Sequence, residues 1–409
     1  MKPVPTMPPH PLRARRDRVP YGVAGVGCAA MLAACTTMGP DQRTTSVPMA
    51  PPQWTLTPQA AWAGLQPGAA PLFERHESLP DGTMTLAESA IVEAGAVKFQ
   101  TGTIDIDVKP LGYSDAGIIF HRQGTRSGEF VYLRANPDCP AANDCIQYVP
   151  IANGLMPWNI YADRQGPAPV APNGWNHLHL VVAERSMAVT VNHEARPSLI
   201  VAPLQVQEGD GIALKGPAIY TNLVVRSGSP AELSAVYPPA PGTVTNWRSA
   251  PPTVAVAGPG PQAADIPSAD AWMPVPGVAS GLVDLGRLFG AAHAPAISTA
   301  WLKATIVASQ PARRVMRIGW ADQVVVFNNG LPVFRGENQY YPADERLSPG
   351  GRLEPDNARV VLDLKAGRNE IVLAVSNRWR RGVGGFEATP YGWGAEAHLD
   401  DLSGLRLPE

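Results

Sequence analysis

A period-two alternation of apolar and polar residues is the feature that most constrains the fold of this chain. In residues 103–109 every second residue is apolar and those between are polar or charged, and residues 176–182 nearly repeat the pattern. Side chains of a strand point alternately to its two faces, so the pattern predicts half-buried strands. Charged residues make up only 17% and the chain has 44 Pro and 39 Gly, which disfavours long helices. We therefore expect an all-β fold built from sheets packed as sandwiches.

Pro-rich stretches divide the chain into two folded regions. Residues 36–53 are rich in Pro, Thr and Met and indicate a flexible tether. Residues 229–271 contain further Pro-rich runs and indicate a linker, part of which packs because it includes Trp247. The sequence therefore predicts two β-sandwich (jelly-roll) domains, at 54–228 and 272–409, joined by a Pro-rich linker.

Residues 1–35 indicate a targeting segment. Four arginines between residues 13 and 18 form a basic start, and the stretch 21–34 is uncharged and weakly apolar. This stretch is too short to span a bilayer, which takes about 20 apolar residues, and fits the central part of a signal peptide. We therefore expect export from the cytoplasm.

The end of this segment, Leu32-Ala-Ala-Cys35, resembles the bacterial lipobox. The resemblance implies a lipoprotein whose Cys35 thiol is acylated before the signal is cut away. Thr36 follows the cysteine, which by the same resemblance implies the outer membrane, facing the periplasm or the cell surface. An ordinary secretory signal with a chance cysteine is the alternative.

Two further cysteines lie in the polar loop Pro-Asp-Cys139-Pro-Ala-Ala-Asn-Asp-Cys145. An exported chain favours their oxidation to a disulfide. Closing so short a loop would stabilise the fold by ~2–3 kcal/mol in the chain-entropy model. A metal site would need more ligands, and the loop contains no histidine.

The first region resembles the concanavalin A-like jelly rolls, a group with laminin-G, lectin and glucanase members. The resemblance covers residues 72–226 and is closest to the bacterial 3-keto-disaccharide hydrolase-like group. The motifs that carry it are Phe99-Gln-Thr-Gly-Thr-Ile-Asp-Ile-Asp-Val, Ala116-Gly-Ile-Ile-Phe-His, Gly174-Trp-Asn-His-Leu, Gly211-Ile-Ala-Leu-Lys-Gly and Tyr220-Thr-Asn-Leu-Val-Val. These motifs are sheet signatures, so they support the fold more than a function.

The second region resembles the galactose-binding-like jelly roll over residues 272–406. Asn329-Gly330 predicts a hairpin turn, because both residues tolerate a positive φ. Residues 360–375 predict a second hairpin, with Val360, Leu362 and Leu364 against Ile371, Leu373 and Val375. Domains of this kind often accompany glycosidases and bind sugars, whereas others brace a neighbouring domain.

Asp105 and Asp107 are the candidates for a catalytic carboxylate pair. They point the same way from one strand, as catalytic carboxylates do in jelly-roll glucanases, and glycoside hydrolysis needs two carboxyls. The third carboxylate of the glucanase pattern is missing and Lys109 intrudes, which favours a solvated strand face instead. His177 and His179 share a strand face too, and without a recognisable partner they indicate surface histidines.

Aromatic residues followed by amide and guanidinium side chains indicate a sugar-binding groove in the first region. Aromatic rings stack on the apolar faces of sugars, and amides and arginines bind hydroxyls. The candidates are Tyr132, Arg134, Gln147, Tyr148, Asn153 and Trp158. The alternative places Tyr132 and Trp158 in the core or in loop packing, because large aromatics dominate cores as well.

The sequence as a whole predicts an envelope lipoprotein that binds a glycan or oligosaccharide and that could also act on glycosides. With 33 Lys and Arg against 35 Asp and Glu, the chain has no basic field for nucleic acid. No motif indicates a cofactor or a metal. Two alternatives stay open: a glycoside hydrolase with unassigned catalytic residues, and a structural or partner-binding envelope protein.

Overall fold

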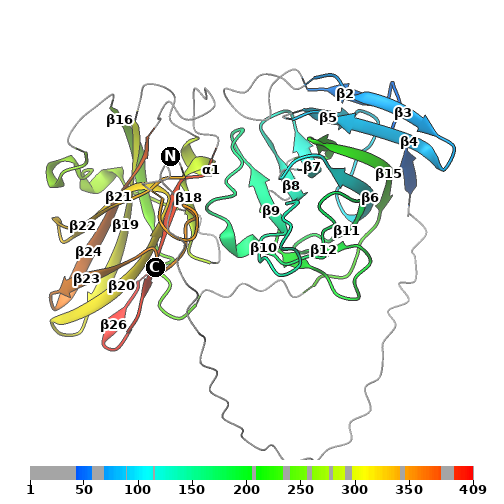
Figure 1. Cartoon of the computed structure of the whole chain (residues 1–409). Coiled ribbons are helices and arrows are strands. Elements are labelled where there is room, and N and C mark those ends of the chain that lie inside the picture. The colour runs from blue at the N-terminus through cyan, green and yellow to red at the C-terminus, as the bar shows by residue number, and fades with distance from the viewer. Residues whose placement is uncertain are drawn as a thin grey trace, which may run out of the picture. The chain divides into compact units, whose positions relative to one another are not determined.

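The computed structural model describes residues 43–57, 69–88, 90–113, 116–204, 209–233, 240–255, 260–275, 280–290, 297–340, 346–378 and 391–408. Cys35 and the targeting segment lie outside these ranges. The described residues form four antiparallel sheets, which pack in pairs as two β-sandwiches (Figure 1). The predicted all-β class is therefore confirmed. No described helix is both long and apolar enough to cross a membrane.

The first sandwich runs from β1 to β15, drawn from blue to green in Figure 1. Its first sheet, here called the polar sheet, has eight strands in the order β13 (Leu199–Val201), β12 (Met187–Val191), β11 (Asn176–Val182), β6 (Gly102–Pro110), β15 (Ala218–Ser227), β4 (Leu79–Leu86) and β3 (Leu72–His76), with β1 (Thr44–Val47) also paired to β15. Its second sheet, the junction sheet, has seven strands in the order β10 (Gln165–Gly166), β9 (Ile146–Ile151), β8 (Ser127–Leu133), β7 (Ala116–Gln123), β14 (Gly211–Lys215), β5 (Ile91–Ala94) and β2 (Trp54–Leu56).

The alternation in the sequence sets which side chains fill this sandwich. Ile104, Ile106 and Val108 of β6 are buried in the core, whereas Asp105 and Asp107 point to the outer face. The inward residues of β11 are buried next to them, because the register places Leu178 beside Ile106. The predicted strands at 103–109 and 176–182 are therefore confirmed.

The second sandwich runs from β16 to β26. One sheet has the order β17 (Met273–Pro274), β16 (Arg248–Ala255), β19 (Ile297–Ala308), β24 (Gly367–Arg378), β21 (Asp322–Asn328) and β22 (Leu331–Asn338), with β26 (Leu405–Arg406) paired to β19. The other has the order β18 (Val283–Asp284), β25 (Gly394–Leu399), β20 (Ala312–Trp320) and β23 (Ala358–Leu364). The described short helices are η1 (Ala162–Arg164), which lies between strands of the first sandwich, and η2 (Ala263–Asp265), η3 (Ala269–Ala271) and α1 (Leu285–Phe289), which lie between strands of the second.

One of the two predicted hairpins of this sandwich is correct and the other is wrong. Asn329 and Gly330 have φ values of 50° and 83° and connect β21 to β22. By contrast, β23 pairs with β20, and β24 pairs with β19 and β21. The inward residues of β23 and β24 meet across the sandwich interior instead of side by side. Each strand then buries its apolar face in the common core, which a flat two-stranded ribbon would not allow.

The Pro-rich stretches contribute to both sandwiches. Thr44–Val47 lies inside the expected tether, yet it forms β1 and buries Val47, so the tether prediction is wrong for this strand. Val244 and Trp247 lie inside the expected linker but are buried in the core of the second sandwich, and β16 belongs to its sheet. Trp247 therefore packs as the sequence suggested, and this part of the stretch belongs to the second sandwich.

A third hydrophobic cluster joins the two sandwiches. It contains outward residues of the junction sheet, residues of the segment Leu155–Tyr161, and Leu282, Ala321 and Leu353 from the second sandwich. Buried hydrogen bonds accompany it: Tyr161 Oη donates to Asp284 Oδ2 at 3.0 Å, and Leu353 N donates to Asn159 O at 2.7 Å. The outer face of the junction sheet is therefore interior to the protein.

Asn159 is the central polar contact of this cluster. Its side chain donates to Gly392 O and accepts from Gly392 N, both at 2.8 Å, and Asn159 is only 3% exposed. A Cβ at residue 392 would lie 2.4 Å from Pro157 Cβ, so this approach requires glycine. The pairing satisfies two backbone groups that would otherwise be buried without partners.

We predict that Asn159→Ala lowers the free energy of unfolding by about 2–4 kcal/mol, because it leaves the Gly392 N–H and C=O buried and unpaired. Chemical denaturation measures this loss. The matched control is Asn173→Ala, at an exposed asparagine with no side-chain hydrogen bond to a described residue, which should change stability by less than about 0.5 kcal/mol. Equal losses in the two variants would contradict the prediction.

Candidate functional site

The residues expected to line a sugar groove meet in one network, but it lies inside the protein. Tyr132 Oη donates to Gln147 Oε1 at 2.8 Å, and Arg134 Nη2 donates to Tyr132 Oη at 2.8 Å. Gln147 Nε2 in turn donates to the carbonyls of Trp158 and Tyr161. Tyr132 and Gln147 are at most 1% exposed, so the segment Leu155–Tyr161 closes over the face on which we expected a groove.

The other groove candidates are also occupied by protein contacts. Tyr148 points the opposite way, into the core between the two sheets of the first sandwich, and is 0% exposed. Asn153 Nδ2 donates to Gly286 O and Arg287 O of the second sandwich, each at 3.0 Å. The expectation of an open groove along these residues is therefore wrong. The space is filled by the second sandwich and by loops of the first sandwich.

Trp158 packs in an aromatic trio at the same junction. Its ring centroid lies 4.8 Å from that of Tyr340 and 5.5 Å from that of Tyr391, both edge to face. Arg352 lies 5.6 Å from its ring centroid on the side of the second sandwich. Trp158 therefore serves in packing between the sandwiches, which was the alternative that the sequence left open.

Asp105 and Asp107 form an ion network with histidines of the neighbouring strand. The register of β6 and β11 places Asp107 opposite His177 and Asp105 opposite His179. His177 Nδ1 lies 2.7 Å from Asp107 Oδ1, and His179 Nδ1 lies 2.7 Å from Asp105 Oδ1. Arg226 of β15 donates to Asp105 as well. The aspartates lie on the partly exposed outer face of the sheet, whereas the expectation of unpartnered histidines is wrong.

The electrostatics of this network do not suit glycoside hydrolysis. Partial burial acts to raise the pKa of Asp105, but hydrogen bonds from His177, His179 and Arg226 outweigh it and hold the pKa well below its ordinary value. The pKa of Asp107 is lowered in the same way, by His177 and Asn222 against burial. Both carboxyls are ionised at neutral pH, so the pair lacks the protonated acid that the reaction needs.

Within the described ranges, no group of three or more His, Cys, Asp or Glu side chains is arranged to hold a metal ion. The histidines of β11 and the aspartates of β6 are instead paired with one another.

A surface pocket of about 650 Å³ opens at one end of the first sandwich. Its lining comes from residues 109–113 at the end of β6 and after it, from Ala135 and Pro137 after β8, and from Pro172 and Asn173 before β11. The volume falls within the range of about 300–1,000 Å³ that small-molecule sites occupy. We call it the loop pocket.

The first wall of the loop pocket is fixed on two sides by backbone hydrogen bonds. Leu111 N donates to Pro217 O at 3.1 Å, and Ala135 N donates to Tyr113 O at 2.6 Å. A Cβ on Gly112 would lie 2.7 Å from Pro217 Cγ, so glycine permits the close approach. Leu111 and Tyr113 then remain 50% and 57% exposed, which leaves an aromatic ring open to a ligand.

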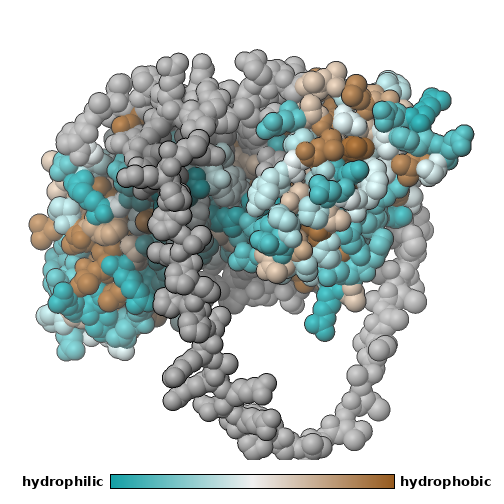
Figure 2. Space-filling view, in the orientation of Figure 1, coloured by the Kyte–Doolittle hydropathy of each residue, from teal (hydrophilic) through white to brown (hydrophobic). Residues whose placement is uncertain are grey.

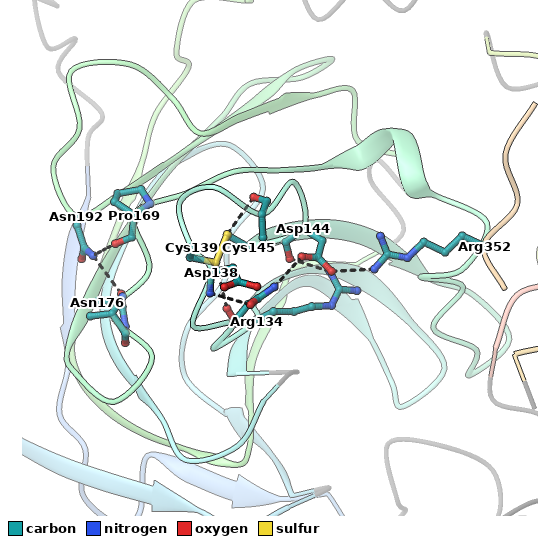
Figure 3. Close-up of a disulfide and its surroundings, with 12 residues drawn as sticks. Arg134, Asp138, Cys139, Asp144, Cys145, Pro169, Asn176, Asn192 and Arg352 are labelled. Atoms are coloured by element: carbon teal, nitrogen blue, oxygen red, sulfur yellow. Dashed lines mark hydrogen bonds and ion pairs between the residues drawn. A yellow bond between two sulfur atoms is a disulfide. The ribbon is translucent and has the colours of Figure 1, made fainter. Parts of the chain in front are cut away.

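The second wall is held by the disulfide between Cys139 and Cys145, which confirms the predicted pairing (Figure 3). Within this loop, Asn136 Nδ2 donates to Asp144 Oδ1 and Asp138 N donates to Asn136 Oδ1. Arg352 of the second sandwich reaches the loop and donates to Asp144 Oδ2 at 3.0 Å. The loop is therefore tied both to itself and to the second sandwich.

The third wall is held by two asparagines, the buried Asn176 and the partly buried Asn192, which Figure 3 shows beside the disulfide loop. Asn176 accepts from Ala171 N at 2.7 Å and donates to the carbonyls of Ala171 and Gly174. Asn192 Nδ2 donates to Pro169 O at 2.7 Å and to Asn176 Oδ1 at 3.1 Å. Side-chain amides thus replace regular strand pairing and set the shape of residues 169–174.

Three side chains of the pocket keep their polar groups available. Lys109 Nζ, the Tyr113 hydroxyl and the Asn173 amide have no hydrogen-bond or ion-pair partner in the part of the chain that the structure describes. The sequence alone does not reveal this set, because its members come from three separate segments. The signal available was Leu-Gly-Tyr113 directly after a strand, an aromatic residue in a loop.

Comparison with known proteins finds similarity at the level of solved structures. No protein-family model matches the chain, and no curated protein matches it. A carbohydrate-binding module, CBM66 from Bacillus subtilis, is 10% identical with a TM-score of 0.29, over 42% of this chain and 93% of that chain.

Two enzyme structures are similar at the same level. Domain 4 of AbnA, a GH43 extracellular arabinanase from Geobacillus stearothermophilus in complex with arabinotriose, is 12% identical with a TM-score of 0.28, over 42% of this chain and 79% of that chain. A β-1,3-glucanase from Mycobacterium marinum is 11% identical with a TM-score of 0.27, over 44% and 93%. Similarity at this level does not transfer a ligand or an activity.

The ion network predicts a pH dependence of stability. Hydrogen bonds to Asp105 and Asp107 raise the pKa of His177 to about 9, against an ordinary value near 6.5. The folded protein therefore binds the extra proton between these values, and its contribution to stability is complete below about pH 6.5 and lost as the pH rises through about 9. The free energy of unfolding should fall by about 1–2 kcal/mol across this window, after allowance for solvent screening.

His177→Gln should lack that fall, as measured by denaturant titration at pH 6, 7.5 and 9.5. The control is His76→Gln, on the exposed strand β3, which should keep the wild-type fall. If His177→Gln keeps the full wild-type fall in the free energy of unfolding, the pH dependence does not come from His177.

Proposed function

We propose that this chain is a carbohydrate-binding lipoprotein of the cell envelope, and that it binds its glycan in the loop pocket. The observation that carries the proposal is an exposed aromatic ring, Tyr113, in a pocket of about 650 Å³, beside Lys109 and Asn173, whose polar groups have no partner among the described residues. Sugars offer apolar faces and hydroxyls together, and such mixed sites orient them.

The stiffness of the pocket supports binding. Its walls are held by backbone hydrogen bonds, by the disulfide and by Asn176 and Asn192 before any ligand arrives. A ligand then spends little free energy on ordering the loops, which favours affinity. This is the arrangement expected of binding residues on loops of a rigid scaffold.

The charges favour binding over cleavage. No residue of the described pocket lining is a carboxylate, and the only carboxylates that the sequence suggested, Asp105 and Asp107, are held ionised in the network of the polar sheet. Hydrolysis of a glycosidic bond needs two carboxyls in reach of it. We therefore favour a binding protein over a glycoside hydrolase.

We assign the second sandwich a bracing role in this proposal. It covers the outer face of the junction sheet, and its Arg352 holds Asp144 in the disulfide loop. The envelope location rests on the signal-like residues 1–34 and the lipobox-like Leu32-Ala-Ala-Cys35.

The expected outcome for Tyr113→Ala is a loss of about ten- to a hundredfold in affinity for the glycan that an array identifies, or ~1–3 kcal/mol. Its melting temperature should stay within about 2 °C of the wild type, because the ring is 57% exposed. Calorimetric titration and thermal denaturation of the same samples measure both.

Trp158→Ala is the contrasting variant. It should lower the free energy of unfolding by about 2–4 kcal/mol, since it removes a ring packed against Tyr340 and Tyr391. Binding lost in a normally stable Trp158→Ala protein, with Tyr113→Ala unaffected, would move the site from the loop pocket to the junction.

Cys35→Ser tests the anchor. The variant should be unlipidated and should leave the detergent-rich phase on Triton X-114 partition, because a thiol is needed to carry the lipid. Retention of Cys35→Ser in the detergent phase to the wild-type extent would exclude the lipobox reading of Leu32-Ala-Ala-Cys35.

A further inference from the structure

The loop pocket carries a single charge. Its lining includes one cation, Lys109, and no aspartate or glutamate among the described residues. Asn173 and Tyr113 add neutral polar groups, and the other lining residues are apolar or glycine. The chain as a whole is near neutral, at −2, so the positive pocket is a local feature and does not reflect the overall composition.

Nothing described in the protein neutralises Lys109. Asp107 is the nearest carboxylate on the same face of β6, two residues away, but His177 and Asn222 already bind its two oxygens. The neighbours of Lys109 on the flanking strand β15 are uncharged, since the register places Ile219 beside it. Within the described residues no side chain forms an ion pair with Lys109 Nζ, so the ammonium group is open to a ligand.

The position of Lys109 also directs that charge. It lies near the end of β6, where the register pairs it with Ile219 of β15, so its backbone is fixed on that side, whereas the pairing of β6 with β11 ends at Val108. The side chain is only partly exposed, and a partly desolvated cation gains more from an anion than one in open water. A sugar ring stacked on Tyr113 would hold its substituents in the same small pocket as Lys109.

We infer that the ligand of the loop pocket is an acidic glycan, a sugar bearing a carboxylate, with the acid group on Lys109 Nζ and a ring face on Tyr113. This inference rests on the proposed function and adds the chemical class of the ligand. Asn173 supplies an amide for a hydroxyl. The single lysine sets a preference for anionic over neutral sugars of the same skeleton, and salt weakens that preference.

A glycan array that pairs acidic sugars with their neutral methyl esters tests the inference, followed by titration with the best pair. Wild-type protein should bind the acid at least about tenfold more tightly than its ester in low salt. Lys109→Met should remove this preference, by weakening binding of the acid much more than binding of the ester. Lys365→Met, an exposed lysine of the second sandwich, is the matched control and should keep the preference. Tyr113→Ala should weaken both forms.

The outcomes distinguish a failure of the acidic ligand from a failure of carbohydrate binding itself. Binding confined to neutral sugars, or an equal affinity for acid and ester, overturns the acidic ligand and leaves carbohydrate binding in place. A preference for acids that Lys109→Met retains also overturns it, because the charge would then lie elsewhere. Failure to bind any glycan on the array overturns the proposed function itself.

Discussion

The burial of the outer face of the junction sheet is the constraint on which the rest of the structure depends. That face carries Phe130, Tyr132 and other large apolar side chains, which would be unfavourable in water. The segment Leu155–Tyr161 and three apolar residues of the second sandwich cover it. Burial at this place removes the sheet face as a binding surface and leaves the loop end of the sandwich for a ligand. Among the described residues that are coloured in Figure 2, hydrophobic ones form small patches separated by hydrophilic ones.

The junction and the loop pocket are connected through the disulfide loop. Arg352 donates to Asp144 and to Gln165, and Arg134 donates to the Asp144 carbonyl from the other side. The same loop supplies Pro137 to the pocket. Changes in how the sandwiches pack would therefore reach the pocket through Arg352.

Local pattern was enough to predict the strands but not their partners. Alternation identified the buried residues of β6 and β11, and Asn329-Gly330 identified its turn, because both signals lie within a few residues. The pairing of Asp105 and Asp107 with histidines requires the register of strands 70 residues apart. The groove residues were correctly grouped, since Tyr132, Arg134 and Gln147 do meet, but the side chains that cover them lie in segments far along the chain. For the same reason the three segments of the loop pocket carried no joint signal.

The contact of Asn159 with Gly392 has a consequence for how such a chain can evolve. Residue 392 must lack a side chain, and residue 159 must offer both a donor and an acceptor, although 233 positions separate them. A recombination event that exchanged one sandwich for a homologous copy would break this match. It would also expose an apolar sheet face to water. We therefore expect the two sandwiches to be inherited as one module, and a gene fragment that ends between them to encode a protein prone to aggregate.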